Sequence, residues 1–220
     1  INLIIVLIIM PYYKSKNLLF VHIPKTGGTV IEDAIKKGGK YGKQTLYTAC
    51  ARNSILPAPF SKYSLQHQFY STIYYYRTKL NVNFDKIKVF SVVRNPYDRI
   101  LSDLFFMKLI KPNSSKEEVF DIIKNKYIDE EAFKFDNHNT PQYLYVTDTK
   151  GEIIKDIKIF HTETLNDDNN ELNLFAGINI DIKRDNVNKD YIKYLNSESI
   201  SLINEKYKKD FELFGYKMIT

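Results

Sequence analysis

The sequence has little cysteine, glycine or proline. Its single cysteine, Cys50, excludes an internal disulfide and any zinc site built from several cysteines. With 8 glycines and 7 prolines in 220 residues, the chain is neither collagen-like nor a low-complexity linker protein. No internal repeat and no Pro/Gly/Ser-rich linker divides it. These absences favour one globular domain that is long enough to bury a sizeable core.

The sequence also lacks an apolar run long enough to cross a bilayer. Residues 1–10 are apolar apart from Asn2, but a transmembrane helix needs about 20 such residues. The run is open to three interpretations: the tail of a signal anchor, an artefact that precedes a true start at Met10, or a buried first strand. We therefore treat residues 1–17 as an N-terminal apolar segment and residues 18–220 as the domain.

Charge of one sign does not dominate the chain. The 32 basic and 26 acidic residues give a net charge of +6, which favours an anionic partner. The lysines are scattered along the sequence and not gathered in a patch. We therefore predict no nucleic-acid partner.

Strand-like and helix-like segments alternate along the chain. This order predicts an α/β fold, a single domain with a mainly parallel sheet flanked by helices. Apolar, β-branched runs predict strands at 18–23, 86–93 and 156–161. Helices are expected at about 29–37, 71–80 and 95–109, from 115 onward, and as one long helix over 196–214.

Two of these helices have clear starting signals. Asn95 is suited to be an N-cap, with Pro96 at the first helical position. Ser115 and Glu118 have the spacing of a capping box. Gly215 marks the expected end of the C-terminal helix.

A glycine-containing turn lies between the first strand and the first helix. Glycines there let backbone N–H groups approach an anion, and the helix N-terminus adds its positive dipole end. A lysine adds a full positive charge, and two threonines add hydroxyl donors. The lysine precedes the glycines, so the GxxxxGK[ST] spacing of an ordinary ATPase or GTPase is absent. The predicted P-loop-like anion site consists of Pro24, Lys25, Thr26, Gly27, Gly28 and Thr29.

A second segment, VVRNPYDRILS over residues 92–102, follows the most continuous strand. Arg94 falls where that strand ends, at the edge where open parallel sheets bind ligands. Ser102 lies about two helical turns further on, where it could share an anion with Arg94. Arginine is suited to recognise a phosphate with two parallel hydrogen bonds.

Together the two segments resemble the PAPS-dependent carbohydrate sulfotransferases, in the branch that includes the uronyl 2-O-sulfotransferases. PAPS is 3′-phosphoadenosine-5′-phosphosulfate. HIPKTGGT at 22–29 is similar to the 5′-phosphosulfate loop of that family, and 92–102 is similar to its 3′-phosphate motif. Weaker similarity at TPQYLYVTD, DIKIFHTETL and YKKDFELFGY extends the resemblance over about residues 18–216. The chain departs from the family at His161 and Thr162, and in a short, divergent middle section where such enzymes hold the acceptor.

The resemblance implies in-line transfer of a sulfuryl group from PAPS to a hydroxyl, with PAP as the released product. Lys25 would stabilise charge on the departing PAP, and the loop N–H groups would hold the 5′-phosphate. Arg94 and Ser102 would bind the 3′-phosphate. No metal is predicted, because the sequence shows neither HExxH nor a cluster of histidines and carboxylates.

The general base is open between two residues. His67 matches where related uronyl sulfotransferases carry a catalytic histidine, and imidazole suits proton transfer near neutral pH. Glu32 is the alternative, since other sulfotransferase branches use a glutamate on this helix, although a capping box with Thr29 explains it too. His138 could contact the acceptor, whereas His22 is expected to be packed.

The implied function is therefore sulfuryl transfer from PAPS to a hydroxyl of a glycan or related acceptor. The alternatives are a nucleotide or small-molecule kinase with a similar loop, and a non-catalytic module that binds polyanions. A signal anchor would place the protein in the Golgi, attached to the membrane only through that anchor, and a start at Met10 would place it in the cytoplasm. The acceptor, the sulfated position and the oligomeric state stay open.

Overall fold

The computed structural model contains a four-stranded, mostly parallel sheet. It describes residues 11–37, 55–131, 134, 136–165, 167, 169–177 and 191–220. The strands are β1 (Tyr12–Tyr13), β2 (Leu18–Val21), β3 (Lys88–Val93) and β4 (Ile157–His161), in the order β1-β2-β3-β4. β1 is antiparallel to β2, and β2, β3 and β4 are parallel. The predicted α/β fold with a mainly parallel sheet is confirmed. The apolar segment 1–10 lies outside the described residues. So does most of the region 38–63, which lies between the motifs at 22–29 and 92–102.

Seven α-helices surround this sheet in the described part of the chain. They are α1 (Gly28–Lys37), α2 (Tyr70–Tyr75), α3 (Pro96–Phe106), α4 (Lys116–Ile122), α5 (Asn169–Ala176), α6 (Ser197–Lys206) and α7 (Lys208–Phe214). No helix among the described residues is both long and apolar enough to cross a membrane.

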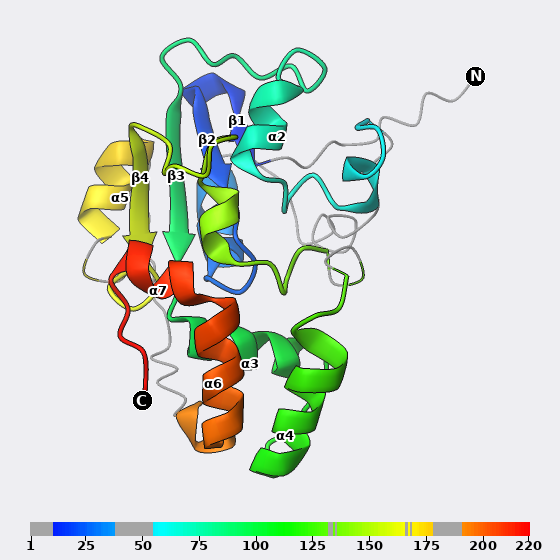
Figure 1. Ribbon diagram of the computed structural model, residues 1–220. Coiled ribbons are helices and arrows are strands. Elements are labelled where there is room, and N and C mark those ends of the chain that lie inside the picture. Colours follow the sequence, from blue (N-terminus) through cyan, green and yellow to red (C-terminus); the bar gives the residue numbers. More distant parts are fainter. Residues whose placement is uncertain are drawn as a thin grey trace.

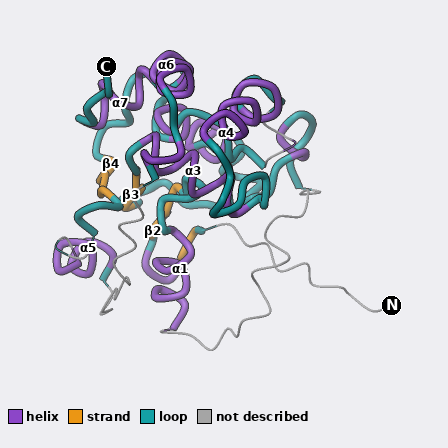
Figure 2. Tube along the Cα trace, turned by 90° about the horizontal axis from the view of Figure 1, so that it is seen from below, coloured by secondary structure: helices purple, strands orange, loops and turns teal. Residues whose placement is uncertain are grey.

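Both faces of the sheet are buried, because successive strand residues point to opposite sides. Leu18 and Phe20 of β2 pack with Ile31 of α1 and with residues of α5 on one face. Leu19 and Val21 pack on the other face, against α2 and the segment that contains Tyr145 and Val146. Figure 2 shows α1 and α5 on the same side of the strands.

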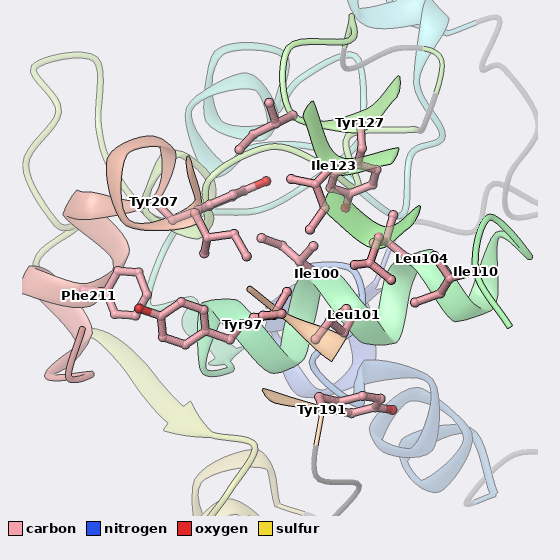
Figure 3. Close-up of a cluster of buried hydrophobic side chains, with 14 residues drawn as sticks. Tyr97, Ile100, Leu101, Leu104, Ile110, Ile123, Tyr127, Tyr191, Tyr207 and Phe211 are labelled. Atoms are coloured by element: carbon pink, nitrogen blue, oxygen red, sulfur yellow. The ribbon is translucent and has the colours of Figure 1, made fainter. Parts of the chain in front are cut away.

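A separate apolar core lies beyond the carboxyl ends of the parallel strands, which point toward α3 (Figure 1). Here Ile100, Leu101 and Leu104 of α3 are buried among residues of α4, α6 and α7. Figure 3 shows these α3 side chains in the same core as Ile123, Tyr207 and Phe211. This core fixes α3 at the edge of the sheet where Arg94 and the glycine turn lie.

Both predicted cap signals are confirmed. The Asn95 side chain accepts from the backbone N–H of Tyr97 at 3.0 Å, and Pro96 is the first residue of α3. Ser115 and Glu118 form a reciprocal capping box before α4. These local interactions depend on residues three or fewer positions apart, which is why the sequence reveals them.

Several expected boundaries were wrong. The single helix over 196–214 is two helices that meet at Tyr207. Tyr207 is buried and donates its hydroxyl to the carbonyl of Asn139 at 2.8 Å, so a tertiary contact turns the chain there. α1 begins at Gly28, so Thr29 lies inside the helix and does not form the N-cap of a capping box with Glu32. The expected helices 71–80 and 95–109 end earlier, at Tyr75 and Phe106.

Candidate active site

The candidate active site lies at the carboxyl edge of the three parallel strands. The loop of residues 24–27, which we call the anion loop, follows β2 and leads directly into α1. Arg94 follows β3, and Thr162 follows β4. Because parallel strands end at the same edge, residues from three distant parts of the chain meet there.

Three consecutive carbonyl groups of this region are held by side chains. Arg99 Nε donates to the Pro24 carbonyl at 3.0 Å, and Arg94 Nη1 donates to the Lys25 carbonyl at 3.2 Å. Thr162 Oγ1 donates to the carbonyl of Thr26 at 2.6 Å. These three carbonyl oxygens are therefore held by Arg99 of α3, by Arg94 after β3 and by Thr162 after β4.

The turn itself requires unusual backbone angles. Lys25 and Gly27 adopt φ values of 65° and 90°, and only a glycine takes the second without strain. Gly28 is required for another reason, because a Cβ there would lie 2.3 Å from Nε2 of His22. The second glycine therefore makes room for a histidine ring, a role that the sequence motif did not suggest.

The ammonium group of Lys25 lies over an aromatic ring. Its Nζ is 4.0 Å from the ring centroid of Phe106, the last residue of α3. Phe106 is 59% exposed, so this cation–π contact is at the surface of the site. Burial lowers the pKa of Lys25, and the nearby carboxylate of Asp103 opposes that shift.

Arg94 combines a fixed backbone with an incompletely paired side chain. The side chain of Gln142 bonds both backbone groups of Arg94, at 2.9 and 2.8 Å. Within the described part of the chain, the buried Nε of Arg94 has no hydrogen-bond partner. A buried guanidinium N–H without a partner is costly and is satisfied when an anion binds. Ser102 is half-buried, six residues into α3 from Pro96.

Three histidine rings pack next to the anion loop. His22 comes from the end of β2, His67 from a turn before α2, and His138 from the segment before Pro141. The His67 ring packs edge-on against both others, with centroids 5.1 Å from His22 and 5.0 Å from His138. All three histidines are buried. We call this group the histidine cluster.

Each ring of the histidine cluster is paired through Nδ1 with a carboxylate. His22 contacts Oε1 of Glu32 at 2.6 Å, and Gln66 donates to the same oxygen at 2.8 Å. The other two pairs are His67 with Asp136 at 2.9 Å and His138 with Asp103 at 2.7 Å. An ionised carboxylate only accepts hydrogen bonds, so Nδ1 carries the proton in His67 and in His138, and Nε2 of the neutral ring keeps its lone pair.

Burial sets the protonation of this cluster. It lowers the pKa of His67 and of His138 below the ordinary value of 6.5, while the paired carboxylates oppose the shift. Burial tends to raise the pKa of Asp136 and of Asp103, but their histidine partners leave both pKa values lowered. Near neutral pH His67 and His138 are therefore neutral imidazoles beside the ionised carboxylates of Asp136 and Asp103.

A search with family models matches residues 12–217 to the sulfotransferase family. The match includes the anion loop, Arg94, the histidine cluster and all four strands. This chain is a sulfotransferase. No significant match was found among curated proteins or among solved structures.

The sulfotransferase brings together most of the residues that its sequence singled out. Lys25 and Arg94 meet at the anion loop, and His67, His138 and Glu32 meet in the histidine cluster. Glu32 is buried and faces His22 and Gln66. His161, which ends β4, contacts the carbonyl of Phe214 through Nε2 at 3.1 Å and lies outside this cluster.

Several residues of the site were missed. Arg99 had no predicted role, but it is buried and donates to the carbonyls of Pro24, His138 and Thr140. Asp103 and Asp136 gave no signal, since neither lies near its histidine in the sequence. The run of polar residues over 136–140 was the one sequence feature that pointed to this part of the site.

The sequence showed no clustered ligand set for a metal, but the fold creates one. His67, Asp136 and His138 each place one potential ligand atom within 4.8 Å of the others. Both carboxylate oxygens of Asp136 already accept hydrogen bonds, from the backbone N–H of Ser64 at 2.6 Å and from His67. Nδ1 of His138 is likewise committed to Asp103. These contacts support a role for the three residues in His–Asp hydrogen-bonded pairs. That the protein uses no metal stays a prediction.

Proposed function

We propose that this sulfotransferase transfers a sulfuryl group from PAPS to a hydroxyl group of a glycan. The observation that carries the proposal is the placement of the histidine cluster beside the anion loop. His22 lies two residues before that loop, and its ring centroid is 5.1 Å from that of His67. A charged lysine and a neutral imidazole in the same site are the two groups that such a transfer needs.

The anion loop and Arg94 are suited to the two phosphate groups of PAPS. With the loop carbonyls tied back by Arg99, Arg94 and Thr162, the N–H groups at the start of α1 are available to an anion. The unpartnered Nε of Arg94 supplies a further charged donor at the same edge. We assign the 5′-phosphate to residues 24–29 and the 3′-phosphate to Arg94 and Ser102.

Lys25 and His67 would act on opposite sides of the transferred group. Lys25 would neutralise the negative charge that develops on the bridging oxygen as the S–O bond to PAP breaks. His67 would accept the proton of the acceptor hydroxyl as its oxygen forms the new bond to sulfur. His138 is placed in the same cluster, where it could contact the acceptor.

Ligand binding and transfer assays test this proposal. Calorimetry should detect binding of PAP, and binding of ATP with magnesium should be much weaker. Labelled PAPS should then transfer its label to members of a panel of uronic-acid-containing and neutral glycans. The Lys25→Ala and His67→Ala variants are the background controls. Absence of PAP binding by the folded protein would refute the donor, and transfer to non-glycan hydroxyls only would refute the acceptor class.

A further inference from the structure

One carboxylate in the histidine cluster has the position and the partners to control the base. We propose that Asp136 is a positioning residue that holds the proton on Nδ1 of His67 and thereby directs Nε2 toward the acceptor hydroxyl. This inference rests on the proposed function of His67. Asp136 lies 69 positions from its partner, and only the fold brings them within 2.9 Å.

The Asp136 carboxylate is fixed from both of its oxygens. Oδ1 accepts the backbone N–H of Ser64 at 2.6 Å, and Oδ2 accepts Nδ1–H of His67. The next residue, Asn137, donates its side-chain amide to the carbonyl of His67 at 2.9 Å. Asp136 and Asn137 therefore hold the turn that carries His67 through three hydrogen bonds.

The backbone of Asp136 and Asn137 is strained. Asp136 and Asn137 have φ values of 48° and 67°, in the left-handed region that costs energy for residues other than glycine. Asn137 is fully buried, and Tyr145 donates its hydroxyl to the Asn137 carbonyl at 2.7 Å. Such strain persists only where the surroundings fix the conformation, as they do here.

The chemistry of the pair follows from its polarity. A neutral imidazole carries one N–H, and a carboxylate beside Nδ1 keeps that proton there. Nε2 is then the acceptor when the substrate O–H bond breaks, and the acceptor oxygen forms its bond to sulfur as PAP leaves. The imidazolium that results has Asp136 beside it, which stabilises the new positive charge. The proton on Nε2 is afterwards released to solvent.

The groups around His67 shift its pKa in opposite directions. Burial and the neighbouring His22 lower its pKa, whereas Asp136 and Glu32 raise it. Removing the charge of Asp136 therefore lowers the pKa of His67 further. Since the base works only as neutral imidazole, the acidic limb of kcat/KM should move to lower pH in such a variant.

The decisive variant is Asp136→Asn. It keeps a carbonyl oxygen for Ser64 N–H but presents an amide donor to His67, which favours the tautomer with the proton on Nε2. We expect kcat to fall about 10²–10⁴-fold with PAP affinity unchanged, comparable in kind to tautomer loss in Asp-His pairs of other enzymes. Asp129→Asn is the matched control, because the Asp129 side chain is 84% exposed and lies outside the cluster.

The tautomer is also measured without any turnover. Nitrogen chemical shifts of His67 should show Nδ1–H in the wild-type protein and Nε2–H in Asp136→Asn. A wild type that fails to transfer to any acceptor refutes the proposed function, while these shifts still decide the role of Asp136. Wild-type turnover in Asp136→Asn, an unchanged tautomer, or activity that is lost on chelation and restored by zinc would each overturn the inference.

Discussion

The anion loop and the histidine cluster are neighbours, but they are built in different ways. The anion loop is a continuous segment after β2, and its geometry comes from backbone angles and from carbonyls tied by Arg99, Arg94 and Thr162. The histidine cluster is assembled from three distant segments, and each of its rings is paired with a side-chain carboxylate.

The difference shows what each region can tolerate. A side chain of the anion loop binds the anion together with several backbone N–H groups. Loss of that side chain therefore leaves part of the anion site in place. A proton acceptor has no such substitute in the cluster. We therefore expect the histidine cluster to govern turnover and the anion loop to govern affinity as well as turnover.

The largest effect should come from His67→Ala. Loss of a positioned base should lower kcat about 10²–10⁴-fold, while the dissociation constant of PAP stays nearly constant because the anion loop is intact. Steady-state kinetics and calorimetry on the same folded sample measure both quantities. Glu32→Gln is the comparison, since glutamine keeps an oxygen for His22 and Gln66. If Glu32→Gln abolishes transfer and His67→Ala does not, the base is Glu32.

Lys25→Ala should have the next largest effect. Removing a charge that stabilises the leaving group should lower kcat about 10²–10³-fold, with weaker PAP binding as a secondary effect. Phe106→Leu tests the cation–π contact at 4.0 Å, and we expect it to cost much less than the loss of the lysine itself. Near-normal turnover in Lys25→Ala would remove the lysine from the mechanism.

Arg94→Ala should separate the two phosphate positions. A charge-assisted hydrogen bond contributes about 1.5–3 kcal/mol, so PAP should bind about 10–150-fold more weakly. Adenosine 5′-phosphosulfate lacks the 3′-phosphate and should lose far less affinity. Ser102→Ala should show the same selectivity with a smaller change. Equal losses for both ligands would mean that Arg94 serves the fold through the Lys25 carbonyl and not the 3′-phosphate.

The smallest effect concerns the contact between the two regions. Gly28→Ala would place a Cβ 2.3 Å from Nε2 of His22, whose ring is held by Glu32 and Gln66. Overpacking of this kind costs about 1–3 kcal/mol, and each kcal/mol lowers the melting temperature by about 2–4 °C in a chain of this length. In a His22→Ala background the same glycine substitution should be nearly neutral. A penalty that persists without the imidazole would show that backbone strain is its cause.

The sequence predicted those parts of the site that depend on neighbouring residues. The anion loop, Arg94 at the end of β3 and the cap at Asn95 are all encoded within a few positions. The three parallel strands followed from apolar, β-branched runs in the sequence. Local chemistry was sufficient for each of these features.

The parts of the site that the sequence did not predict depend on contacts between distant residues. The pairing of His67 with Asp136 spans 69 positions, and that of His138 with Asp103 spans 35. The break at Tyr207 likewise follows from a hydrogen bond to Asn139, 68 positions away. No periodicity or spacing reports such pairs, because their geometry exists only once β2, β3 and α3 are assembled.

The tied carbonyls of the anion loop have a consequence for the kinetics of association. The carbonyls of Pro24, Lys25 and Thr26 accept hydrogen bonds from three side chains, so contacts that involve no nucleotide hold the loop in its conformation. A ligand that meets a site already in its bound shape needs no closing step. The observed association rate of PAP should therefore rise linearly with its concentration and reach no plateau, whereas in Thr162→Val, which frees one carbonyl, a plateau set by loop ordering should emerge.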